Sequence, residues 1–345
     1  MVINLKEKTT LLSVLTYTLK SNYLLFTYLM VPLLIQEYRN TAYLAILGAF
    51  LIVMVLLLFL PKEIKNINYL NIINKSFVAK ISYYLLQFIQ LVLQIVLTAY
   101  TVNRMFFSEI NIIVFLAITT LLIIYISCNN IETIFNSSTF LFLFTIILIF
   151  IPFLLTNEVK DYTLLKPFEI KNSLKFLLLI YFGLDAFTIV FSGVKMNKKL
   201  TKGKLFIPIA IFFLFMSIEL LNIILVTGHT FMVDNEFLGF FSLFIQDTIN
   251  YIGNLGIVYL LIIPIIGSYK GGYALRKIKD EYKISNKFYT NIFIFLILFC
   301  LCFFIVKYFK VQDFVYITLL ISLGLLSVLY VFIVINRSEK YEIRF

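Results

Sequence analysis

The sequence predicts an all-α integral membrane protein with about ten transmembrane helices. Of its 345 residues, 61% are hydrophobic and 14% are charged, whereas soluble domains carry about 25% charged residues. The apolar residues form blocks of roughly 17 to 25, and each block is long enough to cross a hydrocarbon core of about 30 Å as a helix. Continuous apolar runs such as residues 45–61 lack the alternation of a barrel strand. These observations exclude a water-soluble enzyme and a β-barrel.

Ten apolar windows define the expected membrane spans, and residues 1–345 are expected to form a single membrane domain. A shorter apolar stretch, residues 236–249, is expected to insert partly beside the eighth span. The expected spans are residues 11–35, 42–60, 81–102, 111–128, 139–155, 173–194, 205–227, 252–269, 289–308 and 314–336.

Basic residues in the connections predict the orientation of the chain. With the N-terminus inside, roughly 20 Lys and Arg lie on the cytoplasmic side and roughly 8 lie outside, so both termini are expected to be cytoplasmic. The net charge of +11 is expected to face anionic lipid headgroups rather than nucleic acid. The longest basic connections, 61–80 and 270–288, are too short for an ATPase or sensor domain.

Ionisable residues within the spans are the first candidates for function, because each costs roughly 2.5 to 3.5 kcal/mol on insertion scales. Asp185 lies near the middle of the sixth span, two residues after Gly183. A helix that breaks near Gly183 would expose backbone carbonyls and amides beside this carboxylate, as in secondary transporters. We therefore predict a ligand or ion site at Asp185. The alternative is a structural acid that is protonated or paired with a lysine.

The first span carries a polar run inside its apolar segment. Ser21 and Asn22 favour a local unwinding, because their side chains readily bond the neighbouring backbone. Two interpretations of Lys20 stay open. It forms an ion pair with Asp185 across the bundle, or it extends its ammonium to the cytoplasmic interface.

Amide side chains follow one helical face of the third span at Gln87, Gln90 and Gln94. Such a stripe lines a hydrated path or holds helices together. Glu219 in the seventh span is open to the same two interpretations. Asn254, in the eighth span, is expected to line a cavity.

Catalytic and metal-binding constellations are not recognisable in the sequence. His229 is the single histidine, and no Cys or acidic cluster surrounds it. Cys128, Cys300 and Cys302 fall within or beside apolar spans without the paired spacing of a zinc site or a disulfide framework. We therefore expect no enzymatic activity, no cofactor and no metal site.

Several local patterns accompany the ten spans. Pro32 ends the first span, Glu132 follows the fourth span in ISCNNIETIFN, and Pro167 lies in LLKPFEIKNSLK before the sixth span. In their order and spacing these features resemble the B-subunit of spore nutrient germinant receptors. That family is similar to permeases of the amino acid/polyamine/organocation superfamily. The resemblance covers roughly residues 8 to 310.

The second half of the chain carries further parts of this resemblance. The YFGLD of residues 181–185 is similar to a Phe-Gly-Glu stretch of the family, with the acid shifted and shortened, and FLGFFSLFIQDTINYIGNLG resembles its amphipathic helix before the eighth span. The chain departs from the family at two motifs. Asn130 and Asn136 replace a Gly and an Arg, and Asn254 and Gly256 replace an Arg-x-Asp pattern.

The resemblance implies a five-plus-five inverted repeat, with the first repeat at about residues 11–155 and the second at about 173–336. Broken helices one and six would surround a pocket for a small nutrient, usually an amino acid. The residues expected to bind this ligand are Ser21, Asn22, Gly183, Asp185, Phe187 and Asn254. Those expected in an ion path or in pairing are Lys20, Gln87, Gln90, Gln94, Glu132 and Glu219.

The resemblance also implies partners and a location. The partners would be a membrane subunit with soluble domains and a lipoprotein, in the inner membrane of a spore-forming bacterium. Nutrient binding would open an ion path and start germination. Two other functions stay open: an ion-coupled amino-acid transporter of the same fold, and a membrane polysaccharide polymerase or flippase. The short external loops disfavour the polymerase.

Overall fold

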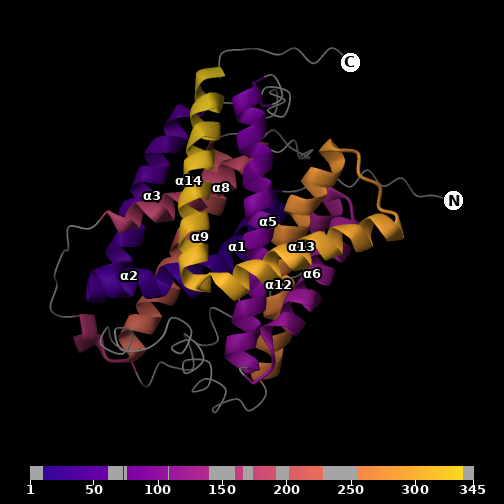
Figure 1. Cartoon of the computed structure of the whole chain (residues 1–345). Helices are drawn as coiled ribbons and strands as arrows, with labels where there is room; N and C mark the ends of the chain where they lie inside the picture. Colours follow the sequence, from indigo (N-terminus) through magenta and orange to yellow (C-terminus); the bar gives the residue numbers. More distant parts are fainter. Residues whose placement is uncertain are drawn as a thin grey trace.

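A computed structural model describes residues 11–60, 73, 76–107, 109–139, 160–165, 174–191, 202–227 and 255–336 (Figure 1). These residues are helical apart from their connections. The α-helices are α1 (Leu11–Leu25), α2 (Val31–Tyr38), α3 (Ala42–Phe59), α5 (Phe77–Phe106), α6 (Ile112–Ser127), α8 (Ile180–Phe191), α9 (Lys202–Thr227), α12 (Leu255–Glu281), α13 (Phe288–Tyr308) and α14 (Val311–Ile335). Shorter helical segments are η1 (Phe26–Met30, π-helical), η2 (Arg39–Thr41), η4 (Tyr162–Leu165), η5 (Lys175–Leu179) and Ile131–Thr139.

Long apolar helices identify the chain as an integral membrane protein. Within the described residues, 5 helices are long and apolar enough to cross a bilayer. A sixth candidate is the pair formed by α6 and Ile131–Thr139, which meet at a bend of 112°. The five candidates are Val31–Phe59, Phe77–Arg104, Phe206–Val226, Phe288–Tyr308 and Val311–Ile335.

Helices lie in most of the predicted windows, but the described residues contain only five or six candidate spans, and the candidate Val31–Phe59 runs from the end of the first predicted window through the second. Local sequence explains two of the helix starts: Ser76 accepts a hydrogen bond from the amide of Ala79 at the start of α5, and Asn111 accepts one from the amide of Ile113 at the start of α6. Most of the predicted fifth span and the helix predicted at 236–249 lie outside the described residues.

The basic connection predicted after the eighth span is largely helical. That span was expected to stop at residue 269, with a basic connection over 270–288, but α12 continues without interruption to Glu281. One lysine of this stretch, Lys279, is buried and donates hydrogen bonds to Ser127, Asn286 and Asn291. Hydropathy alone ends a span at the first charge, whereas a matched charge can stay in a helix.

Two predicted helix breaks differ from the structure. The first span stays α-helical through Ser21 and Asn22, and its irregularity comes later, in the π-helical segment η1. Gly183 lies inside the continuous helix α8, so the break predicted there is wrong. A Cβ atom at Gly183 would overlap the side chain of Val53 on α3, so this glycine permits close helix packing.

The helices form two groups that α1 joins (Figure 1). In one group α5, α6 and α12 pack together, and in the other α3 packs against α8 and α9. Helix α1 contacts α12, α9 and α8, while α14 packs along α5 and α8. Polar side chains of α1, α5, α8 and α12 therefore converge where the two groups meet.

Candidate functional site

An ion pair between two helices forms the centre of the candidate site. The Lys270 ammonium of α12 lies 2.8 Å from Oδ2 of Asp185 on α8. Both side chains are only 2% exposed. Taking either charge out of water costs several kcal/mol, so each needs the other in this environment. The ion pair agrees with the alternative interpretation of Asp185 as an acid paired with a lysine. The ligand or ion site at Asp185 stays a prediction.

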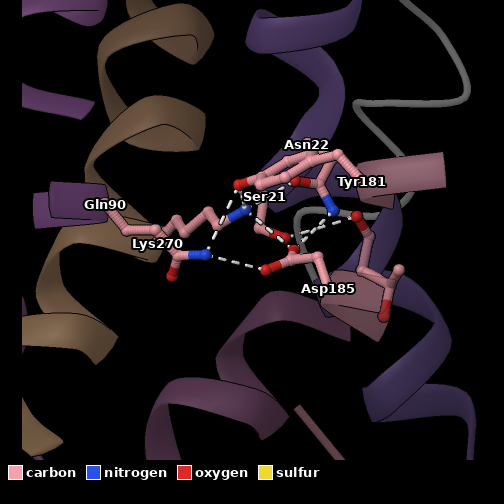
Figure 2. A network of polar contacts seen from close by, with 7 residues as sticks. Ser21, Asn22, Gln90, Tyr181, Asp185 and Lys270 are labelled. Carbon is pink, nitrogen blue, oxygen red and sulfur yellow. Dashed lines mark hydrogen bonds and ion pairs between the residues drawn. The ribbon is translucent and has the colours of Figure 1, made fainter. Parts of the chain in front are cut away.

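The ammonium of Lys270 uses all three of its donors. Besides Asp185, it donates to Oδ1 of Asn22 at 2.6 Å and to the hydroxyl of Tyr181 at 2.9 Å. A lysine has three N–H donors and no acceptor, so its hydrogen-bonding capacity is filled. Asn22 comes from α1 and Tyr181 from α8, so one cation connects three helices (Figure 2).

The Asp185 carboxylate is matched on both oxygens. Oδ2 also accepts a hydrogen bond from Nδ2 of Asn22 at 2.9 Å, and Oδ1 accepts one from Nε2 of Gln90 on α5 at the same distance of 2.9 Å. We call Asn22, Gln90, Tyr181, Asp185 and Lys270 the Asp185 network (Figure 2). The side chains of these five residues satisfy one another's hydrogen bonds. The network places one positive and one negative charge side by side.

Three residues predicted to bind ligand make their contacts outside the Asp185 network. Ser21 is buried beside the network, but its hydroxyl donates to the carbonyl of Thr18 within α1. The ring of Phe187 stacks on Tyr330 of α14. Gly183 packs against Val53 as described above. Asn254 lies outside the described residues.

Lys20 does not pair with Asp185, and it does not reach the interface, so both interpretations of this residue are wrong. Its side chain is fully buried, and Nζ lies 3.1 Å from the centre of the Tyr269 ring. Nζ has no hydrogen-bond partner among the described residues. The helical twist of α1 separates Lys20 from Asn22, which places the two side chains on different faces.

The glutamine stripe of the third span has one member in the network. Gln90 reaches Asp185, whereas Gln87 and Gln94 are buried without joining it. Neither amide atom of Gln94 has a hydrogen-bond partner within the described part of the chain. Glu132 is partly exposed at the start of the segment Ile131–Thr139, and it is not brought to the network.

Glu219 of α9 lies in a second buried polar contact. Its Oε1 accepts a hydrogen bond from the hydroxyl of Thr27 at 2.9 Å, and the side chain is 7% exposed. This pair contains no residue of the Asp185 network.

Sequence reasoning missed Lys270 and Tyr181. Lys270 was assigned to a cytoplasmic connection because it follows the apolar window. The sequence GSYKGG contains a signal of its position, since Gly267 and Gly271 are spaced four apart as in closely packed membrane helices. A Cβ at Gly271 would overlap Ile123 of α6, and one at Gly267 would overlap Thr98 of α5. A lysine between two such glycines must itself lie in the helix bundle.

The fold and the site define an α-helical integral membrane protein with a charged hydrogen-bond network buried between its helices. No model of a known protein family matches the chain, and no curated protein matches it. The functional argument therefore depends on the site itself.

Proposed function

We propose that this chain is the membrane subunit of a nutrient germinant receptor, and that a small zwitterionic nutrient such as an amino acid binds at the Asp185 network. The observation that carries the proposal is the buried pair of Lys270 and Asp185, with opposite charges on two different helices. An amino acid carries the same two charges in one molecule. Its ammonium fits Asp185 and its carboxylate fits Lys270.

Binding by exchange keeps both protein charges paired. The ligand replaces the direct contact of Lys270 and Asp185 with two new ion pairs, so neither charge is left bare in a low-dielectric environment. Asn22 and Gln90 offer amide groups that can hydrogen-bond either the ligand or the carboxylate. The exchange separates α8 from α12 by the width of the ligand. A ligand that favours the separated arrangement shifts the population of the protein towards it.

The arrangement around the first helix supports a permease-like architecture. The π-helical segment Phe26–Met30 interrupts the first helix one turn after Asn22, and interrupted helices frame the midplane sites of many transport proteins. In this proposal the five-plus-five inverted repeat, the cytoplasmic termini and the spore inner membrane follow the family resemblance. The two proposed partners, a membrane subunit with soluble domains and a lipoprotein, also follow the family resemblance.

The experiment is a deletion of the chain in its host, complemented with variants. Spore response to single amino acids is scored beside vegetative amino-acid uptake. Asp185→Asn and Lys270→Met should each lose the response to one nutrient. Because each single change also leaves a buried charge unpaired, the double variant, which leaves none, is scored beside them, and it should lose the response at a membrane level closer to that of the unchanged protein. Asp313→Asn, which changes an exposed aspartate of α14, is the matched control and should retain the response.

The outcomes separate the candidate functions. A lost nutrient response with uptake intact supports the receptor. An uptake defect with normal germination contradicts it and supports the ion-coupled transporter. Unchanged response and uptake in the deletion strain overturn the proposal.

A further inference from the structure

A second buried carboxylate lies between α9 and the first helix. Oε1 of Glu219 accepts the hydrogen bond of the Thr27 hydroxyl at 2.9 Å, whereas Oε2 is buried and has no hydrogen-bond partner among the described residues. Thr27 is fully buried. One carboxylate oxygen is therefore left unmatched inside a membrane span.

No described cation neutralises Glu219. Helix α3, which packs on α9, contains no charged residue, and neither does η4. The single charged residue of α1 is Lys20, whose Nζ lies over the Tyr269 ring. All three N–H donors of Lys270 already form hydrogen bonds within the Asp185 network. A bare carboxylate in such a place costs several kcal/mol, and none of the described residues near Glu219 supplies the compensating charge.

The backbone at Thr27 supplies another oxygen. In η1 the amide of Val31 bonds the carbonyl of Phe26, five residues back, instead of the carbonyl of Thr27. The next residue, Pro32, has no N–H. The carbonyl of Thr27 therefore has no main-chain donor at either the α-helical or the π-helical position. Single π-turns of this kind occur frequently at functional sites.

We propose that Glu219 and Thr27 form a binding site for one monovalent cation, either a proton or Na⁺. Carboxylate, hydroxyl and carbonyl oxygens are the ligands that hard cations prefer. A proton would satisfy the same requirement by neutralising the carboxyl group directly. The site uses no residue of the Asp185 network, so its existence does not depend on the proposed nutrient.

The test uses dicyclohexylcarbodiimide, which modifies protonated carboxyl groups in apolar surroundings. The full chain, purified in detergent, is treated at several pH values in choline chloride or in NaCl, and modified peptides are identified by mass spectrometry. We expect modification at Glu219 and none at Asp185, whose carboxylate is held by Lys270. If the cation is Na⁺, NaCl should protect Glu219 at least tenfold relative to choline chloride. If it is a proton, the two salts should give equal modification.

Two variants control the result. Glu219→Gln should remove the adduct, and Asp185→Asn should retain it. Thr27→Val keeps the carboxyl group but removes one oxygen of the site, so it should weaken the protection by NaCl if the cation is Na⁺. A folded protein that shows no modification of Glu219 in choline chloride at any pH would overturn the site, and so would an adduct that survives Glu219→Gln. Neither result bears on nutrient binding at Asp185.

Discussion

Lys270 and Asp185 face each other across 2.8 Å from helices α12 and α8, and both are sealed from solvent. The two residues are separated by 85 positions in the sequence. Their contact therefore depends on the tertiary fold, and it connects the two groups of helices.

Removing one partner of the ion pair should destabilise the protein strongly. Asp185→Asn leaves the Lys270 ammonium buried without its counter-charge, and Lys270→Met does the same to the carboxylate. Each single change should cost about 3 to 5 kcal/mol. The double variant should cost clearly less than the sum, because it leaves no uncompensated charge. Melting temperatures in detergent provide the measurement, and strictly additive effects would contradict the pairing.

The glycines of α12 should not tolerate a side chain. A Cβ at Gly272 would overlap both Cβ and Cγ2 of Ile126 on α6. Gly272→Ala should therefore lower stability by about 1 to 3 kcal/mol through overpacking. Gly324 of α14 has open space around it, so Gly324→Ala should be neutral or should stabilise by up to about 1 kcal/mol. Equal yields of monodisperse protein from the two variants would argue against close packing of α12 and α6.

Two buried lysines should respond oppositely to the same substitution. Lys279→Met leaves the side-chain oxygens of Ser127, Asn286 and Asn291 without their shared donor, at a cost of about 1 to 3 kcal/mol. Lys20→Met keeps most of the volume and removes an ammonium that has no hydrogen-bond partner in the described residues, so stability should stay equal or rise. Thermal unfolding of both variants compares them directly, and a larger loss for Lys20→Met would show that its ammonium has a stabilising partner.

Acid should weaken one contact at the end of α12. The ammonium of Lys80, at 2.7 Å, holds the pKa of Glu281 below its usual range. A carboxyl whose pKa is lowered by folding contributes stability above its unfolded pKa of about 4.3, and it loses that contribution as the pH falls through the folded value. The contact is partly exposed, so the contribution is small. Glu281→Gln should flatten the dependence of melting temperature on pH below about 4.3, and an unchanged slope would refute it.

The sequence predicted the membrane class and the buried acid, but not the contacts of that acid. Long apolar runs determine the membrane helices, and Asp185 is conspicuous as an acid within such a run. Its partner could not be predicted, because the rotation of each helix about its axis depends on packing with distant segments. Both interpretations of Lys20, the ion pair with Asp185 and the ammonium at the interface, were wrong for this reason. Only one glutamine of an evenly spaced stripe, Gln90, contacts the carboxylate.

Helix irregularities were also only partly predictable. Polar residues suggested unwinding at Ser21 and Asn22, yet both stay helical because hydrogen bonds within α1 and across to other helices satisfy their side chains. The irregular turn falls just before Pro32, where the missing N–H removes a helical hydrogen bond. In this span the proline was thus a better indicator of helix irregularity than the polar residues.

The close approach of α12 to its neighbours has a mechanical consequence. Side chains of α5 and α6, together with Leu24 of α1 at Gly267, fill the places above Gly267, Gly271 and Gly272, so α12 cannot slide along them without a steric clash or an empty gap. Lys270 therefore projects from a closely packed group of three helices, α5, α6 and α12. The side of the ion pair that can yield is then the one that bears Asp185, and a molecule bound between the two charges would move α8 outwards while α12 stays in place.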